Sequence, residues 1–449
     1  MFESNAYRVG YARVDITPRE SVPLAGFGRT SSRMSRAVAN ELYASCFAIT
    51  DAADNTVLLI SMDLQRSGRV EPPYIRAYAK ETYGIPEDHV MLCGTHTHAG
   101  PDQFSDMEVI TRWRENLLYP QLKAAVDMAM TDRVRSRVFI GEVETDHLNF
   151  IKHYYHVTPQ GEKIYFGDCH GKPVIDETTR HATEIDPTMH IVRFVREGAK
   201  DLVLANWRAH PHIYGVKTSH DISSDYVGEW RRVFESKNPL LFTFFQGAAG
   251  NNNATTRMES ERRAGGILSH GRLMTEHLEE GLLNHMREIA PGVIKTRQVI
   301  LTEQVNKPSE DLLEACRAVY KVWTSGGTFQ EAIDAGKEFH IMSPYQAGSC
   351  ISRSHMDDTF PLELNAITFG DLAVVTAPNE LFDAISVYVE DHAPFEKVLT
   401  FGYANGYGGY IPTKFGFEYG SYEADCCYFK PGIGEKIRDT FLEMLNELK

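Results

Sequence analysis

The chain has 449 residues, and 43% of them are hydrophobic, which is enough to bury a large core. Lysine and arginine total 46 against 61 aspartate and glutamate residues, so the formal net charge is −15. Nucleic acids and anionic membranes are themselves negatively charged, and this excess of acidic residues argues against both as partners.

The N-terminus and the cysteines favour an intracellular protein without a membrane anchor. Residues 1–8 lack a basic region followed by an apolar stretch, so no signal peptide is expected. No run of about 18 apolar residues occurs in the sequence, and no transmembrane segment is expected. Seven irregularly spaced cysteines, with Cys426 and Cys427 adjacent, predict reduced thiols. We therefore predict a cytoplasmic location and leave a homo-oligomer open.

Short apolar runs rich in β-branched residues alternate with helical patterns along the chain. Several runs are continuous, as expected for strands that are buried on both faces. The predicted strands cover residues 56–61, 89–93, 189–194, 202–205, 240–245, 373–376 and 398–401. The predicted helices cover residues 112–130, 261–286 and 311–323, and a C-terminal helix carries Ile437, Phe441, Leu445 and Leu448 on one face.

This alternation predicts an α/β fold with a mixed β-sheet core, flanking helices and a single large catalytic domain over residues 1–449. Residues 303–360 differ from the rest, being helical and then rich in loop residues. We expect this stretch to be an insertion or a lid.

The first candidate site follows the strand at 89–93, where His96 and His98 lie in the segment Gly-Thr-His-Thr-His-Ala-Gly-Pro. Side chains at positions i and i+2 of an extended segment point the same way. The two imidazoles could therefore reach one metal ion, or one metal ion and one substrate. They could also be two surface histidines, but ligand sites of α/β folds lie at the carboxyl ends of strands.

The second candidate site follows the strand at 202–205, where His210 and His212 are both able to bind a metal ion. The alternative is that only one of them is a ligand. Asp221, Ser223 and Ser224 come soon afterwards, and the serines are expected to cap a helix that begins near Asp225.

Three more segments follow predicted strands. Residues 246–253 are rich in glycine and asparagine and predict a tight turn or a close approach of the backbone to a ligand. Glu380 is expected in the first turn of a helix, as a stabilising charge or as an oxygen ligand. Five tyrosines between Tyr403 and Tyr422 form a cluster that is typical of a core or an interface.

Together these segments place histidines, a glutamate and tyrosines at strand ends. Zn²⁺ accepts nitrogen and oxygen ligands, and a catalytic zinc site keeps one position for water. Such a water becomes a nucleophile near neutral pH. The sequence therefore predicts a zinc-dependent hydrolase.

In their order along the chain, these motifs resemble the neutral (non-lysosomal) ceramidase family. Residues 9–18 (VGYARVDITP) are typical of the opening of that family, and residues 95–101 are similar to its Thr-His-Thr-His-small-Gly-Pro segment. The later motifs also follow the family order: Asn-Trp…His, Ser-Ser-Asp, a Gly-rich turn, Pro-x-Glu and a Tyr-rich end. The resemblance covers about residues 8–430. It does not include the C-terminal immunoglobulin-like domain of full ceramidases.

The resemblance implies a ligand set for the metal ion and two residues that act on the substrate. The zinc ligands would be His96, His210, Glu380 and Tyr410. His98 would face the substrate, and Tyr422, which precedes Glu423, would be the later catalytic tyrosine.

Two departures from the family pattern fall near these positions. Asn251 follows Gly250 where the family has Gly-Asp, and Lys152 stands in for an arginine of an Asn-Arg segment. Arginine and lysine are not equivalent at a bidentate site. The metal centre is expected to be retained, whereas the residues around the substrate have changed.

Three hypotheses follow. The first is a zinc amidohydrolase that cleaves an N-acyl bond of a small-molecule or lipid-like substrate. The second keeps the metal ion but cleaves an ester, a lactone or a small polar or sugar-derived compound. The third is a metal-stabilised binding protein without turnover.

Overall fold

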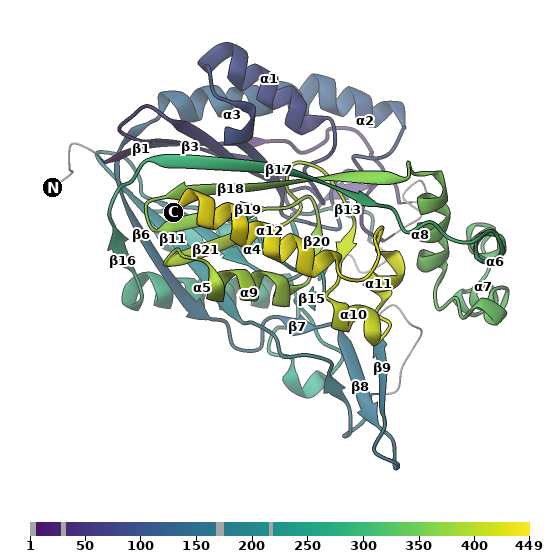
Figure 1. The fold of residues 1–449 in the computed structure, drawn as a ribbon. Coiled ribbons are helices and arrows are strands. Elements are labelled where there is room, and N and C mark those ends of the chain that lie inside the picture. The colour runs from purple at the N-terminus through teal and green to yellow at the C-terminus, as the bar shows by residue number, and fades with distance from the viewer. Residues whose placement is uncertain (1–5, 28–32, 168–174, 215–218) are drawn as a thin grey trace.

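The computed structural model describes residues 6–27, 33–167, 175–214 and 219–449. Two β-sheets face each other and helices cover their outer faces (Figure 1). Helices α1 and α3 lie above the sheets in Figure 1, and α9 and α12 lie on the opposite side. The predicted α/β fold with a mixed sheet core and flanking helices is confirmed.

The larger sheet has nine strands in the order β14-β12-β11-β6-β1-β3-β4-β5, and β16 pairs with β6. The pairs β12–β14 and β4–β5 are parallel, whereas the others are antiparallel. Its strands are β1 (Tyr7–Asp15), β3 (Tyr43–Thr50), β4 (Thr56–Met62), β5 (Val90–Gly94), β6 (Val134–Glu144), β11 (Thr188–Arg196), β12 (Leu202–Trp207), β14 (Leu241–Gln246) and β16 (Arg287–Ile289).

The smaller sheet has the order β17-β18-β19-β21 and is antiparallel except for the parallel pair β19–β21. Its strands are β17 (Ile294–Gln304), β18 (Thr359–Phe369), β19 (Leu372–Thr376) and β21 (Lys397–Phe401). The remaining strands are short: β2 (Ala37–Val38), β7 (Phe150–Ile151), β8 (His153–Val157), β9 (Lys163–Gly167), β10 (Arg180–His181), β13 (Asp221–Ile222), β15 (Asn252–Asn253), β20 (Glu380–Leu381) and β22 (Tyr410–Ile411).

The α-helices of the described residues are α1 (Glu71–Tyr83), α2 (Glu108–Trp113), α3 (Tyr119–Thr131), α4 (Asp225–Lys237), α5 (Ile267–Asn284), α6 (Glu310–Thr324), α7 (Phe329–Asp334), α8 (Pro344–His355), α9 (Asp383–His392), α10 (Lys414–Glu418), α11 (Tyr422–Cys426) and α12 (Ile433–Leu448). A π-helical turn (Arg114–Leu118) joins α2 to α3, so the helix predicted over 112–130 is nearly continuous.

Alternation of side chains along the strands divides the core into layers. On β12, Leu204 points toward the smaller sheet and Val203 toward α4 and α5. Helices α1 and α3 cover the other half of the larger sheet, and α9 and α12 cover the smaller sheet. Strands with helices or a sheet on both faces must be apolar throughout, which explains their continuous hydrophobic runs.

Residues 305–358 connect two strands that pair directly, since Gln304 at the end of β17 lies opposite Thr359 at the start of β18. They form α6, α7 and α8 around a small apolar cluster that includes Val319, Ile341 and Ala347. Helix α8 also contacts α11. The role of this region as a lid stays a prediction.

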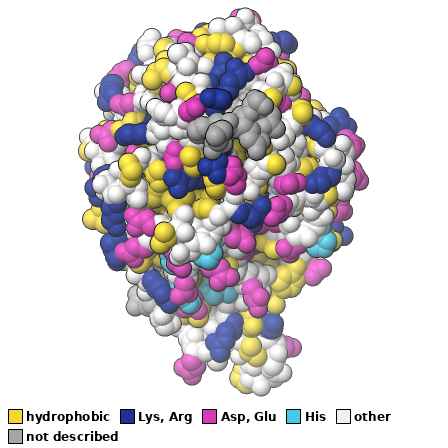
Figure 2. Space-filling view, turned by 90° about the vertical axis from the view of Figure 1, so that its left-hand side faces the viewer, with side chains coloured by type: hydrophobic (Ala, Val, Ile, Leu, Met, Phe, Trp, Pro, Cys, Tyr) yellow, Lys and Arg dark blue, Asp and Glu magenta, His cyan; other side chains and the backbone are white. Residues whose placement is uncertain are grey.

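None of the described helices is both long enough and apolar enough to cross a bilayer. Figure 2 shows the face at the left of Figure 1, where acidic and basic side chains are interspersed. Six cysteines lie within the described ranges, and all six are buried free thiols. Residues 1–5 of the N-terminal segment lie outside the described residues, and the cytoplasmic location stays a prediction.

Candidate metal centre

His96 enters the site from a turn that begins where β5 ends. Its backbone has a φ of +72°, a left-handed conformation that is uncommon outside glycine and is often found at functional sites. Its Nδ1 lies 2.7 Å from the carbonyl oxygen of Gln65. An Nδ1–H that donates to a carbonyl leaves the Nε2 lone pair free, which is the usual arrangement of a metal-binding histidine.

His210 has the same arrangement on the opposite side of the site. It follows β12, and its Nδ1 lies 2.9 Å from the carbonyl oxygen of Asn252. Its Nε2 is 3.2 Å from Oε2 of Glu380, and the Nε2 of His96 is 3.3 Å from the same oxygen. Within the described part of the chain, His210 Nε2 and Glu380 Oε2 are buried without a hydrogen-bond partner. Buried polar atoms without partners are costly, and a bound cation would satisfy both.

His98 turns into the same space. Its Nε2 lies 3.1 Å from the Nε2 of His96. One ligand nitrogen from each of His96, His98 and His210 fits within a spread of 4.8 Å, so this buried group could bind a metal ion. The two histidines of the first segment converge as predicted, but through the left-handed turn at His96 and not through an extended strand.

The charge states of these side chains suit metal binding. Burial lowers the pKa of His210 to about 4 and, with the neighbouring histidines, lowers the pKa of His98 well below its usual value. Burial alone would raise the pKa of Glu380, but His96 and His210 hold it well below its usual range. Neutral imidazoles and an ionised carboxylate are the forms that bind zinc.

The sequence predicted Glu380 in the first turn of a helix, and this prediction is wrong. Glu380 reaches the site from a two-residue strand. Strand β20 pairs in parallel with β22, which places Glu380 opposite Tyr410, and α9 begins at Asp383.

The prediction that Ser223 and Ser224 cap α4 is half correct. Ser223 accepts a hydrogen bond from the backbone N–H of Asp225 at 2.9 Å, whereas Ser224 makes no capping bond to α4.

Three tyrosines of the Tyr-rich segment surround Glu380 and His96. The ring of Tyr403 stacks on that of His96, with centroids 3.9 Å apart. The hydroxyl of Tyr407 donates to Oε1 of Glu380 at 2.8 Å. Burial and the charge of Glu380 raise the pKa of Tyr410 well above its usual value. Sequence reasoning missed the separate roles of Tyr403 and Tyr407, and their only signal was membership of this cluster.

Lys152 and Tyr422 both contact the ring of Tyr410. The Lys152 Nζ lies 5.1 Å above the ring of Tyr410 and 2.8 Å from Oε1 of Glu423. The rings of Tyr410 and Tyr422 meet edge to face, with centroids 5.9 Å apart. His153, which the sequence only placed beside Lys152, binds the other oxygen of Glu423 at 2.5 Å.

Asn251 and His212 each make a hydrogen bond to a neighbouring polar side chain. The side-chain amide of Asn251 donates to Asp383 at 2.7 Å and accepts from the Asp383 backbone at 2.9 Å. An aspartate at position 251 would place a second carboxylate against Asp383, which explains the asparagine. The Nε2 of His212 lies 2.9 Å from the side-chain oxygen of Asn253.

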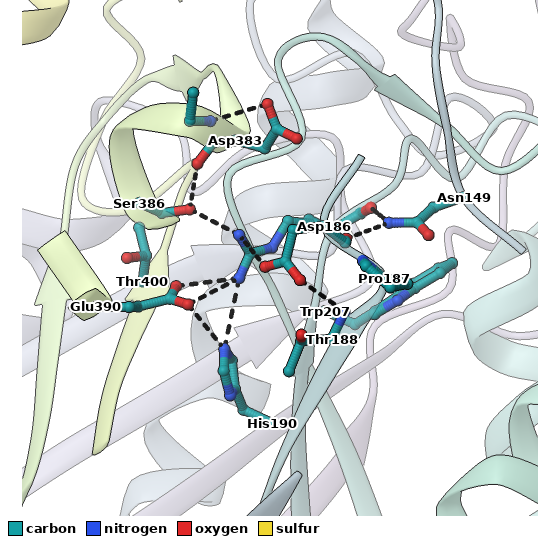
Figure 3. A network of polar contacts seen from close by, with 12 residues as sticks. Asn149, Asp186, Pro187, Thr188, His190, Trp207, Asp383, Ser386, Glu390 and Thr400 are labelled. Atoms are coloured by element: carbon teal, nitrogen blue, oxygen red, sulfur yellow. Dashed lines mark hydrogen bonds and ion pairs between the residues drawn. The ribbon is translucent and has the colours of Figure 1, made fainter. Parts of the chain in front are cut away.

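A buried ionic network ties the His210 segment to the helix that follows Glu380. The Arg208 guanidinium lies 2.7 Å from Asp186 and 3.0 Å from Glu390, and it donates to Ser386 at 3.0 Å. Figure 3 shows Ser386 and Glu390 of α9 on one side of this network and Asp186 and His190 across from them. The network therefore joins β12 to α9, the two elements that lie next to His210 and Glu380.

The network around Arg208 makes the free energy of unfolding depend on pH under acidic conditions. Burial alone would raise the pKa of Glu390, but the charges of Arg208 and His190 hold it at about 2, below the ordinary 4.5. A carboxyl with a lowered folded-state pKa stabilises the protein above its unfolded-state pKa. We expect this contribution to be lost as the pH falls from 4.5 toward 2, and Glu390→Gln to flatten that part of the profile. Denaturant titrations across this range measure it, and equal slopes in both proteins would contradict it.

Comparison with known proteins gives one family. The model for neutral/alkaline non-lysosomal ceramidase, N-terminal, matches residues 7–241. Neutral ceramidase of Pseudomonas aeruginosa is 20% identical over 99% of this chain and 72% of its own length. Neutral ceramidase of Drosophila melanogaster is 29% identical over 53% of this chain, and neutral ceramidase 2 of Arabidopsis thaliana is 22% identical over 59%. The match covers 33% of each of these two proteins.

Solved structures with a similar fold are also ceramidases. A crystal structure of neutral ceramidase from P. aeruginosa has a TM-score of 0.71 and 19% identity, and covers 99% of this chain and 75% of that one. A ceramidase complexed with C2 has a TM-score of 0.72, 18% identity and the same coverage. These likenesses establish the fold. Because the family model matches more than half of the residues, the chain belongs to the neutral/alkaline non-lysosomal ceramidase family.

Proposed function

We propose that this protein is a zinc-dependent hydrolase that cleaves an N-acyl (amide) bond. One observation carries the proposal. The Nε2 atoms of His96 and His210 both face Oε2 of Glu380 in one buried space. Among the described residues, His210 Nε2 and Glu380 Oε2 have no hydrogen-bond partner. The opposite ring nitrogens of both histidines are already held by backbone carbonyls. Membership of the ceramidase family supports amide hydrolysis, since a ceramidase hydrolyses the amide bond of ceramide.

In this proposal His96, His210, Glu380 and Tyr410 hold the zinc ion. A zinc ion bound there would act as a Lewis acid and would lower the pKa of a water molecule to near neutrality. Tyr407 keeps Glu380 in place through its hydrogen bond to Oε1. The backbone carbonyls of Gln65 and Asn252 fix the tautomers of the two histidines.

His98, Tyr422 and Lys152 act on the substrate side. The His98 Nδ1 has no hydrogen-bond partner among the described residues, so it is able to take or give a proton during the reaction. Tyr422 donates a hydrogen bond to the oxygen on which negative charge develops. One such donor contributes about 3 kcal/mol to lowering the barrier. Glu423 holds Lys152 in position for the same region.

A small polar N-acyl compound or ester is the second candidate substrate class. Lys152 and Asn251 favour it, because they replace residues of the ceramidase pattern and lie next to each other. The Lys152 backbone N–H donates to the carbonyl oxygen of Asn251 at 2.9 Å. Ceramide is the substrate that the names of the relatives indicate.

Removal and return of the metal ion tests the proposal. We expect a chelator such as 1,10-phenanthroline to abolish hydrolysis of N-acyl substrates, and stoichiometric Zn²⁺ to restore it, because Zn²⁺ supplies the Lewis acid. Ceramide, short N-acyl amino acids and matched esters should be assayed side by side. Activity that is unchanged after the metal ion has been removed would reject the zinc mechanism. Tight binding of the same compounds without hydrolysis would instead support a binding protein.

A further inference from the structure

Two arginines in the turn after β4, Arg66 and Arg69, form no ion pair with a carboxylate among the described residues. Within the described part of the chain, no carboxylate forms an ion pair with Arg66 or Arg69, in contrast to Arg208 and many others. Arg66 is half-buried and Arg69 is exposed. Both arise in the turn after β4, on a chain whose net charge is −15.

Aromatic rings hold the Arg66 guanidinium in place. Its Cζ lies 4.1 Å from the centre of the Tyr407 ring and 4.4 Å from that of Phe104. Arg69 lies over the other end of this group, with its Cζ 5.1 Å from the Phe104 ring and 5.9 Å from the Phe360 ring. A guanidinium that stacks on rings through its faces keeps its N–H donors at its edge.

The edge of Arg66 remains largely available for a ligand. One of its N–H groups donates to the side-chain oxygen of the adjacent Gln65. A guanidinium has five N–H donors in a planar fork, and the fork matches a carboxylate or a phosphate in a bidentate geometry. Phe104 is 40% exposed, so this group reaches the protein surface.

Two separate links connect Arg66 to the metal centre. Tyr407, whose ring lies under the guanidinium, donates its hydroxyl to Glu380. Gln65, the residue before Arg66, accepts from His96 through its backbone carbonyl. A substrate whose scissile bond lies at the cluster of His96, His210 and Glu380 would therefore have this guanidinium within reach of a neighbouring group.

We propose that Arg66 and Arg69, with Phe104 and Tyr407, form a subsite for an oxyanion carried by the substrate. The substrate class is an N-acyl compound with a carboxylate or a phosphate near the scissile amide bond. The aromatic rings orient the guanidinium groups, and the arginines bind the anion. This inference rests on the proposed hydrolase function, which it makes more specific.

Matched substrate pairs test the subsite. N-octanoylglycine and its uncharged amide differ only in the carboxylate, and N-octanoyl-ethanolamine phosphate and N-octanoyl-ethanolamine differ only in the phosphate. We expect kcat/KM of the wild-type protein to be higher for the anionic compound of one pair than for its neutral counterpart. We expect Arg66→Gln to reduce that preference about 10–100-fold, as for the loss of a charged hydrogen bond. The preferred pair identifies the anion.

Two further variants make the test specific. Arg438→Gln is the matched control, because Arg438 also stacks on a tyrosine, Tyr388, but lies on α12 at the outer surface. It should keep the wild-type preference. If Arg66→Gln does not fold, Arg66→Lys serves instead, since lysine keeps the charge but loses the bidentate fork. A wild-type protein without preference in either pair, or a preference that survives in the Arg66 variants, would overturn the subsite.

Direct binding separates failure of the subsite from failure of the proposed function. If no probe is cleaved, calorimetry of the same four compounds with the purified protein still decides the subsite. Tighter binding of an anionic probe that depends on Arg66 supports it, even though amide hydrolysis would then be in doubt. Equal affinity for the anionic and neutral twins overturns it.

Discussion

Replacing His96 with alanine is expected to abolish hydrolysis and to remove the bound metal ion. His96 supplies an Nε2 that lies 3.3 Å from Glu380 and 3.1 Å from His98, so its loss opens the centre of the cluster. The expected decrease in kcat/KM exceeds about 10³-fold, which corresponds to about 4 kcal/mol in the barrier. Metal analysis of the purified variant should show far less than the roughly one zinc per chain expected of the wild type.

His285→Ala is the matched control for this experiment. His285 is exposed just after α5, and its substitution should leave the metal content and the rate unchanged. Circular dichroism of both variants checks that they remain folded. An active His96→Ala protein, or one that retains a full complement of zinc, would contradict the proposed role of His96.

Replacing Arg208 with methionine is expected to destabilise the protein more than any surface substitution. Arg208 is 2% exposed and lies between the carboxylates of Asp186 and Glu390. Methionine would fill much of the volume but would leave two partly buried carboxylates, Asp186 and Glu390, without the guanidinium. Breaking a buried pair in this way costs about 3–5 kcal/mol. Denaturant unfolding at neutral pH measures the loss in free energy of unfolding.

A double substitution separates loss of charge from loss of packing. Combining Arg208→Met with Glu390→Gln removes one of the stranded carboxylates and should recover part of the stability, so the two changes are not additive. Arg135→Met is a suitable control, because Arg135 pairs with Glu197 at the surface, where such pairs contribute about 0–1 kcal/mol. A decrease below about 1 kcal/mol for Arg208→Met would show that the network does not depend on the arginine.

The pattern of residues gave correct expectations wherever one local property decided the structure. The apolar runs at 202–205 and 240–245 became β12 and β14, because strands covered on both faces tolerate only apolar side chains. The periodicity of Ile437, Phe441 and Leu445 became α12 for the analogous reason. Glu380 was placed in the wrong element, because pairing of β20 with β22 joins residues 30 positions apart and local spacing carries no trace of it.

For the site, residue types and motif order by themselves indicated His96, His98, His210 and Glu380. Their convergence is a property of the tertiary structure, which brings the ends of β5 and β12 and the short strand β20 together around one buried space.

The hydrogen-bond partners of these side chains could not be predicted from the sequence. The carbonyls of Gln65 and Asn252 that orient the two histidines belong to the backbone, which every residue has, so no residue type marks them. The choice of Tyr407 for Glu380 among five tyrosines depends on backbone positions set by the turn after β21. Sequence therefore determined which chemistry is present, and the tertiary structure decided which atoms meet, because contacts between distant segments depend on packing and not on local pattern.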